Sequence, residues 1–135
     1  MGVRLSVRDG SGELDAVETA TEDDFMYFRD SVYAALETGE FGSRFPTFMK
    51  RFFENWESGD VAALKGELIE IHAAFRKLPP DPPDSNWSTK LAMSGRQPET
   101  LAEVYVDNDG SPLIERLISL AALAHDKGLA IIWDA

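Results

Sequence analysis

Residues 111–133 read SPLIERLISLAALAHDKGLAIIW, and two patterns in this stretch decide the fold. Its first part repeats apolar side chains at steps of three and four, as on the buried face of an amphipathic helix. Ser111–Pro112 suit the cap and first turn of that helix and Gly128 suits its end, so the pattern predicts the most buried helix of the chain over 112–127. The apolar run 129–133 has strand character and should lie in the middle of a small sheet.

The N-terminal segment supplies the other strands of that sheet. Val3–Val7 alternates apolar with polar residues and then meets the turn-forming stretch Asp9–Gly12. Leu14–Glu18 would return as the second strand of a hairpin. We expect the run 129–133 to lie beside Val3–Val7, because both are short and apolar.

Two further helices carry the same kind of apolar stripe. Thr21 precedes three acidic residues, which suits an N-cap and the first turn of a helix over 22–38 that Gly39 ends. Ser58 is the expected cap of a helix over 60–78. The sequence therefore predicts an α+β fold, in which a small sheet formed by the N-terminal hairpin and the C-terminal strand packs against three main helices.

The segments between these elements are less regular. Residues 41–57 are rich in aromatic side chains without a clean period, so a short helix and an extended segment both fit. The proline-rich stretch 79–84 ends the preceding helix and predicts a stiff, exposed loop. We expect irregular or short helical structure over 87–96, a short helix over 98–104 and a turn at 107–110.

Length and composition indicate one domain in the cytoplasm. The 135 residues are 44% hydrophobic, which is enough for a single core, so we expect residues 1–135 to form one domain. The N-terminal stretch 1–9 is too short and too interrupted by arginine for a signal peptide or a membrane span. The sequence therefore predicts a cytoplasmic protein with no membrane partner.

The charge balance bears on the kind of partner. There are 24 acidic and 13 basic side chains, for a formal net charge of −11, so we expect no nucleic-acid partner. Residues 1–44 carry ten acids and four bases, and residues 81–135 carry nine acids and four bases. Two interpretations stay open: the charge provides solubility, or it steers the protein onto a basic partner protein.

Candidate partner-binding residues follow from the second interpretation. Glu22, Asp23 and Asp24 stand at the start of the helix predicted over 22–38, and they also suit its N-terminus. Trp133 ends a strand and should be part of the core. Trp87 follows a polar stretch, so it could be partly exposed and anchor an interface, or it could be buried. Burial is the favoured interpretation for Trp87. The candidate set is Glu13, Asp15, Glu18, Glu22, Asp23, Asp24 and Trp87.

No pattern in the sequence indicates catalytic, cofactor-binding or metal-ligating residues. The chain has no cysteine, and neither His72 nor His125 has a second ligand at helical spacing. The acidic turn at 107–110 lacks the ligand spacing of a calcium loop. Ser43 and Ser94 lack the flanking glycines of a nucleophile elbow. We therefore predict no catalytic site, no cofactor and no metal.

Four stretches taken together resemble the immunity protein 70 family of bacterial polymorphic-toxin systems. They are FMYFRD at 25–30, GSRFP at 42–46, FRKLPP at 75–80 and VDNDGSPLIERL at 106–117, in that order. The resemblance implies a cytoplasmic antidote that binds a co-produced toxin domain and blocks it. It brings no catalytic residues with it.

Three hypotheses of function remain. The leading one is an immunity protein that neutralises a cognate, basic toxin domain by stoichiometric, non-covalent binding and is not an enzyme. The second is a small ligand-binding or regulatory module with a pocket between the helices and the sheet. The third is a hydrolase or transferase whose motifs the sequence does not show. A toxin gene directly upstream would distinguish the first hypothesis from the other two.

Overall fold

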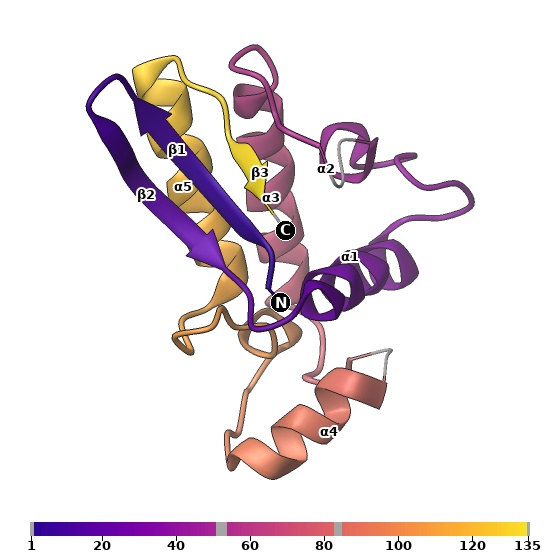
Figure 1. Cartoon of the computed structure of the whole chain (residues 1–135). Coiled ribbons are helices and arrows are strands. Elements are labelled where there is room, and N and C mark those ends of the chain that lie inside the picture. The colour runs from indigo at the N-terminus through magenta and orange to yellow at the C-terminus, as the bar shows by residue number, and fades with distance from the viewer. Residues whose placement is uncertain (1, 51–53, 83–84, 135) are drawn as a thin grey trace.

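The computed structural model describes residues 2–50, 54–82 and 85–134. Within these residues the protein has five α-helices, a short 3₁₀ helix and one three-stranded antiparallel sheet (Figure 1). This is the predicted α+β class, with the sheet made from an N-terminal hairpin and a C-terminal strand.

The sheet consists of β1 (Arg4–Asp9), β2 (Gly12–Glu18) and β3 (Ile132–Asp134). Their order is β2-β1-β3, and β1 pairs antiparallel with both neighbours. Leu5 of β1 lies opposite Trp133 of β3, so the predicted pairing of the two ends of the chain is confirmed.

The prediction that the C-terminal strand lies in the middle of the sheet is wrong. β1 is the central strand, and three of its consecutive residues, Leu5–Val7, are buried, whereas every residue of β3 is at least partly exposed. Strand pairing also starts later than the apolar run suggests. Ile131 instead exchanges two backbone hydrogen bonds with Trp56, at N···O distances of 2.8 and 3.0 Å.

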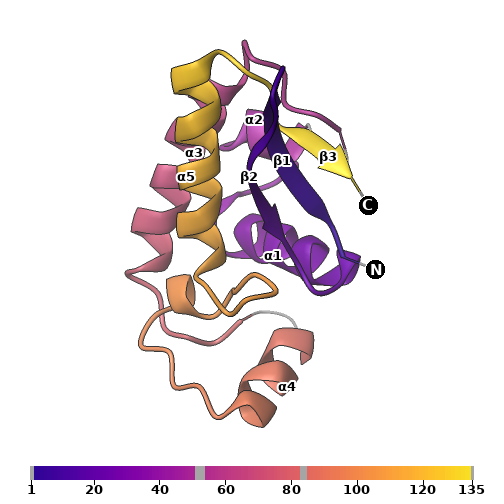
Figure 2. The same ribbon diagram turned by 60° about the vertical axis from the view of Figure 1, so that its left-hand side comes forward.

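The three predicted helices are α1 (Glu22–Leu36), α3 (Val61–Phe75) and α5 (Leu113–Lys127). α3 and α5 run antiparallel side by side, and the turned view shows them with α1 on the same face of the sheet (Figure 2). Each helix places a row of buried residues toward the sheet. The sheet and these helices thus enclose one core.

The ends of these helices follow the sequence in part. Thr21 caps α1 through a capping box with Asp24, and Gly128 ends α5 in the left-handed conformation at φ 66°. Neither predicted serine cap is formed: Asp60 precedes α3, and Pro112 precedes α5. In the second case Pro112 has a non-helical backbone (ψ 118°) and α5 begins at Leu113, so Ser111 lies one residue too early to cap it.

The first predicted cap fails for a similar local reason. Residues 58–60 form a turn, in which the Asp60 N–H donates to the Glu57 carbonyl at 2.8 Å. The helix can begin only after this turn, at Val61. Ser58 therefore lies too early in the chain to cap it.

Three shorter helices fill the segments that the sequence left open. α2 (Pro46–Lys50) and the bridge at Trp56 show that the 41–57 segment is helical in one part and extended in another. α4 (Ser85–Ser94) is longer than the irregular or short helical structure expected there. The 3₁₀ helix η1 (Leu101–Glu103) lies within the predicted short helix. The predicted conformations of residues 51–53 and 83–84 lie outside the described residues.

Aromatic rings dominate the core between the helices and the sheet. Phe28 packs edge-on against Phe48 and Phe75 with centroid distances of 5.7 and 6.4 Å, and Trp133 packs edge-on against Phe25 at 5.4 Å. One void among the described residues, lined by Leu5 of β1 and by residues of the helices, has a volume of ≈10 Å³. This is about the space of one water molecule, so this void is too small for a ligand.

Candidate interaction surface

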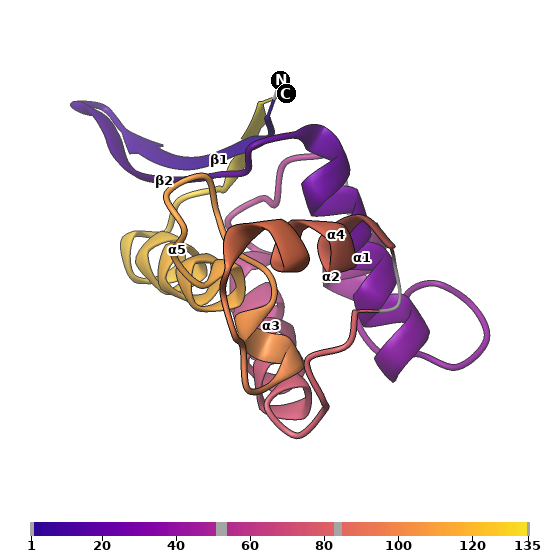
Figure 3. The same cartoon turned by 90° about the horizontal axis from the view of Figure 1, so that it is seen from below.

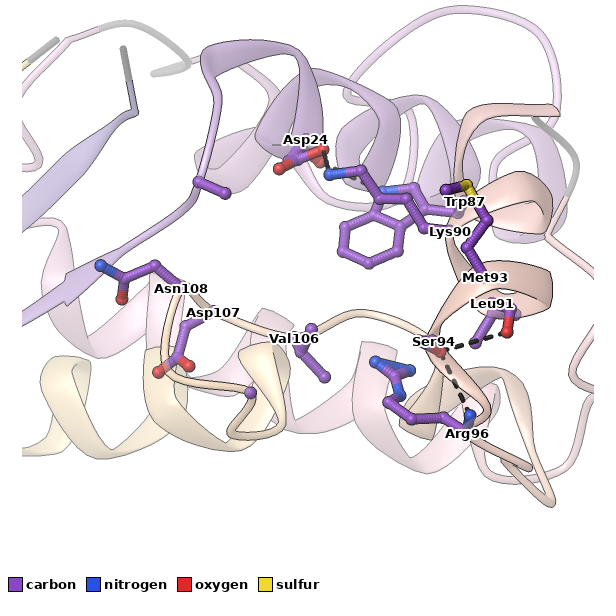
Figure 4. Close-up of a pocket in the computed structure, with 12 residues that line it drawn as sticks. Asp24, Trp87, Lys90, Leu91, Met93, Ser94, Arg96, Val106, Asp107 and Asn108 are labelled. Carbon is purple, nitrogen blue, oxygen red and sulfur yellow. Dashed lines mark hydrogen bonds and ion pairs between the residues drawn. The ribbon is translucent and has the colours of Figure 1, made fainter.

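A groove runs between α4 and the segment 106–110, and we call it the α4 groove. Its volume is ≈470 Å³. α4 supplies Trp87, Leu91 and Met93 on one side, and Val106 with Asn108 faces them from the other side (Figure 4). Most of the exposed lining is apolar, so the groove suits an apolar group of a partner.

Asp24 joins α4 to α1. The Asp24 carboxylate caps α1 and also forms an ion pair with Lys90 (Figure 4). The Trp87 indole N–H donates to the Asp24 backbone carbonyl at 3.4 Å, and the Lys90 ammonium lies 5.0 Å from the centre of the Trp87 ring. Asp24 is only 2% exposed, so it positions α4 and α1 rather than presenting charge to a partner.

Trp87 is buried at the base of the groove. It is 3% exposed and packs edge-on against Tyr105 with a centroid distance of 5.2 Å. The core interpretation of this residue is therefore confirmed, and partial exposure is wrong. Its ring still lines the α4 groove, so a group that enters the groove would lie against it.

The opposite wall is a tight turn bonded to β2. The Asp107 carboxylate accepts the backbone N–H groups of Asp109 and Ser111, both at 2.9 Å. The Asn108 N–H donates to the Glu18 carbonyl at 2.8 Å. The turn that the sequence predicted at 107–110 is thus present, and it holds two regions distant in sequence together.

A second hollow lies on the far side of this turn, and we call it the acidic hollow. It has a volume of ≈440 Å³ and its exposed lining is almost entirely polar. It shares the residues Asp107 and Asn108 with the α4 groove, so the two hollows adjoin at this turn. Five carboxylates among the described residues line it: Glu13, Asp15, Glu18, Asp107 and Asp109.

Two arginines offset part of this negative charge. Arg4 forms ion pairs with Glu13 and Glu18, and Arg116 of α5 pairs with Asp15 at 3.1 Å. The bonds to Glu13 raise the pKa of Arg4, and those to Asp15 raise the pKa of Arg116, so both stay protonated. Five carboxylates with two guanidinium partners leave the described part of the hollow negative.

The structure groups the sequence-derived candidates into three places. The β2 residues Glu13, Asp15 and Glu18 lie together in the acidic hollow. Glu22 and Asp23 are exposed on the first turn of α1 and do not line it. Asp24 and Trp87 are buried beside the α4 groove.

Sequence reasoning missed Asp107 and Asp109 as members of this surface. Both were assigned to a turn, which is correct, but nothing local indicated which strand the turn would contact. The Asn108 side chain donates a hydrogen bond to the Glu18 carboxylate, which helps to join the turn to β2, and these two residues are 90 positions apart in the sequence. The excess of acids in the two ends of the chain was the one signal that could have suggested that they meet.

The described residues show no cluster of three or more His, Cys, Asp and Glu side chains able to hold a metal ion. His72 instead lies 3.4 Å from Glu115 across the α3–α5 interface. In the described part of the chain, no helix has the length and apolar character needed to cross a membrane.

Comparison with known proteins identifies one family. The model of immunity protein 70 matches residues 12–132, which include all three main helices, the α4 groove and every lining residue of the acidic hollow except Arg4. No curated protein and no solved structure matches the chain.

Proposed function

Because the chain belongs to the immunity protein 70 family, we propose that it neutralises a cognate toxin domain in the producing cell by stoichiometric, non-covalent binding. The family match over residues 12–132 is the observation that carries this proposal. An immunity protein acts by occupying its toxin, which is a non-enzymatic role. The toxin would belong to a polymorphic-toxin system, and the encounter would take place in the cytoplasm.

The acidic hollow supports a basic toxin domain as the partner. Its carboxylates come from β2 and the 107–109 turn and exceed the arginines that pair with them. Exposed negative charge accelerates the encounter with a positively charged protein and repels phosphate backbones. The net charge of −11 acts in the same direction over the whole molecule.

Co-expression with the adjacent gene tests this proposal. The C-terminal domain encoded directly upstream is produced in a bacterial host, alone and with this protein. We expect growth arrest by the domain alone, rescue by the pair, and a 1:1 complex after purification. The toxin domain of an unrelated system serves as a control and should not be neutralised. Continued arrest in the presence of folded protein would refute the proposed function.

The ligand-binding hypothesis keeps one possible location, the α4 groove. Its volume of ≈470 Å³ lies within the range of small-molecule sites, whereas the void lined by Leu5, Leu68 and Leu117 measures ≈10 Å³. A small molecule that copurifies with the protein, and that the purified toxin domain does not displace, would favour this second function.

A further inference from the structure

We propose that the α4 groove and the acidic hollow form one docking surface, which receives a toxin segment with an apolar side chain close to a basic side chain. This inference rests on the proposed function and adds the chemistry of the contact. The apolar side chain would enter the α4 groove, and the basic one would enter the acidic hollow.

The apolar half of this surface is built for contact. Met93 on α4 is 83% exposed, although it is a large apolar residue, and Leu91 and Val106 are only partly buried. The buried ring of Trp87 lines the same groove. A flexible methionine in a groove that is also lined by an aromatic ring can adapt to the shape of an incoming side chain.

The polar half fixes the charge of the occupant. The hollow begins at Asp107 and Asn108, where the groove ends, so one short segment can reach both. Asp107 itself is turned toward the turn backbone and Arg116, with the nearest guanidinium contact at 3.7 Å. The β2 carboxylates Glu13, Asp15 and Glu18 pair with Arg4 or Arg116 but remain 34%, 35% and 40% exposed. Together with the exposed Asp109 they attract a cation.

Other occupants fit this surface less well. A second copy of the chain would bring its own charge of −11 and its own acidic hollow to the contact. Nucleic acid would place phosphates against carboxylates. A basic protein segment is the occupant whose charge complements the hollow and whose apolar side chains complement the groove.

The place of α4 leaves the groove accessible to a partner. In the view from below, α4 lies outside the layer formed by α3 and α5 and next to α1 (Figure 3). The contacts that hold it include Trp87 and Lys90, both on Asp24. Trp87 also packs against Tyr105 of the core, so one wall of the groove is anchored before a partner binds.

The test measures binding of the upstream-encoded toxin domain to matched variants by surface plasmon resonance. Met93→Glu places a charge at the mouth of the groove and should raise Kd about tenfold or more, since a buried interface charge without a partner is costly. Glu18→Gln with Asp109→Asn should lower the association rate several-fold at low salt and weaken its salt dependence, roughly as expected for lost steering charges. Folding of each variant is checked by its thermal transition.

Matched controls carry the same chemical changes elsewhere. Ile69→Glu on α3 puts a charge on a residue that is 47% exposed and does not line either hollow. Asp126→Asn at the end of α5 removes an exposed acid from the far end of that helix. Both controls should bind the toxin domain within about twofold of the original protein, as expected for surface changes outside the contact.

The outcomes separate the two proposals. If the unmodified protein does not bind the toxin domain, the proposed function fails. If it binds and neutralises the domain while Met93→Glu and the double amide variant bind equally well, the docking surface is wrong and the function stands. Hydrogen exchange provides a second measurement: protection of residues 87–96 and 105–111 in the complex supports the inference, and protection confined to α3 refutes it. A dimer of the free protein that Met93→Glu dissociates would assign the groove to a second copy and also refute it.

Discussion

Replacing Leu68 by alanine should destabilise the protein by about 3–4 kcal/mol. Leu68 on α3 is 2% exposed and lines the small void between the sheet and the helices, together with Leu117 of α5. Truncation to alanine removes three buried carbons, and each contributes ~0.8 kcal/mol of hydrophobic free energy, so the loss is roughly 2.4 kcal/mol. The space left behind adds ~1 kcal/mol for each 40 Å³ that the neighbours do not fill.

The rigid neighbours of this void support the upper part of that range. Phe25, Phe48 and Trp56 line it as well, and large rings that already pack against one another have little freedom to move into new space. Leu117→Ala should cost a similar amount, because that side chain is 4% exposed. The double variant should cost less than the sum by at least ~0.5 kcal/mol, since the two cavities share walls.

Urea unfolding followed by tryptophan fluorescence measures these differences. Ile69→Ala is the matched control, because it lies on the same helix and is 47% exposed, and it should cost less than about 1 kcal/mol. A loss below ~1 kcal/mol for Leu68→Ala would show that the α3 stripe does not face a packed core. Strict additivity of the two leucine variants would show that they do not border a common cavity.

Three further predictions use the same protein. Gly128→Ala should cost about 1–2 kcal/mol in urea unfolding, because an alanine at φ 66° is strained even where there is space for its methyl group. Hydrogen bonds from the side chain and backbone N–H of Ser11 lower the pKa of Asp9. This carboxylate therefore stabilises the hairpin above its normal pKa and loses that effect as the pH falls through the lowered value. Asp9→Asn should therefore flatten the acid side of the stability profile, and an unchanged profile would contradict the assignment. Converting Glu13, Asp15 and Glu18 together to amides should slow association with the toxin domain, and most at low salt. The thermal stability should fall only slightly, because Asp15 pairs with an arginine of α5. An association rate that neither salt nor these changes affect would mean that the charge serves solubility.

Local sequence patterns were sufficient for the main elements. The stripes of α1, α3 and α5 repeat at helical spacing, and the hairpin has glycine at its turn, so each could be predicted without knowledge of its neighbours. Gly128 shows the same, because a glycine directly after a helical stripe is the usual left-handed end of a helix.

Features that depend on distant contacts could not be predicted in this way. α4 has a mostly polar sequence, and its place is fixed by Trp87 and Lys90 contacting Asp24 more than 60 residues earlier. The acidic hollow needs the turn at Asn108 to meet β2 at Glu18, again through long-range contacts. β3 lies at the edge of the sheet because the core buries β1 more than β3. An apolar run in the sequence does not reveal which of two strands will be the more buried.

Because β1 lies between β2 and β3, the sheet is complete only when both ends of the described chain are present. As the nascent chain leaves the ribosome, the β1–β2 hairpin comes first, and a two-stranded hairpin is marginal by itself. Until β3 has been translated, the second edge of β1 lacks its partner and can pair with other chains. This arrangement gives the sheet a high contact order, which slows folding. We expect synthesis that stops before Ile132 to produce an aggregation-prone fragment, so cells would gain working protein only from completed chains.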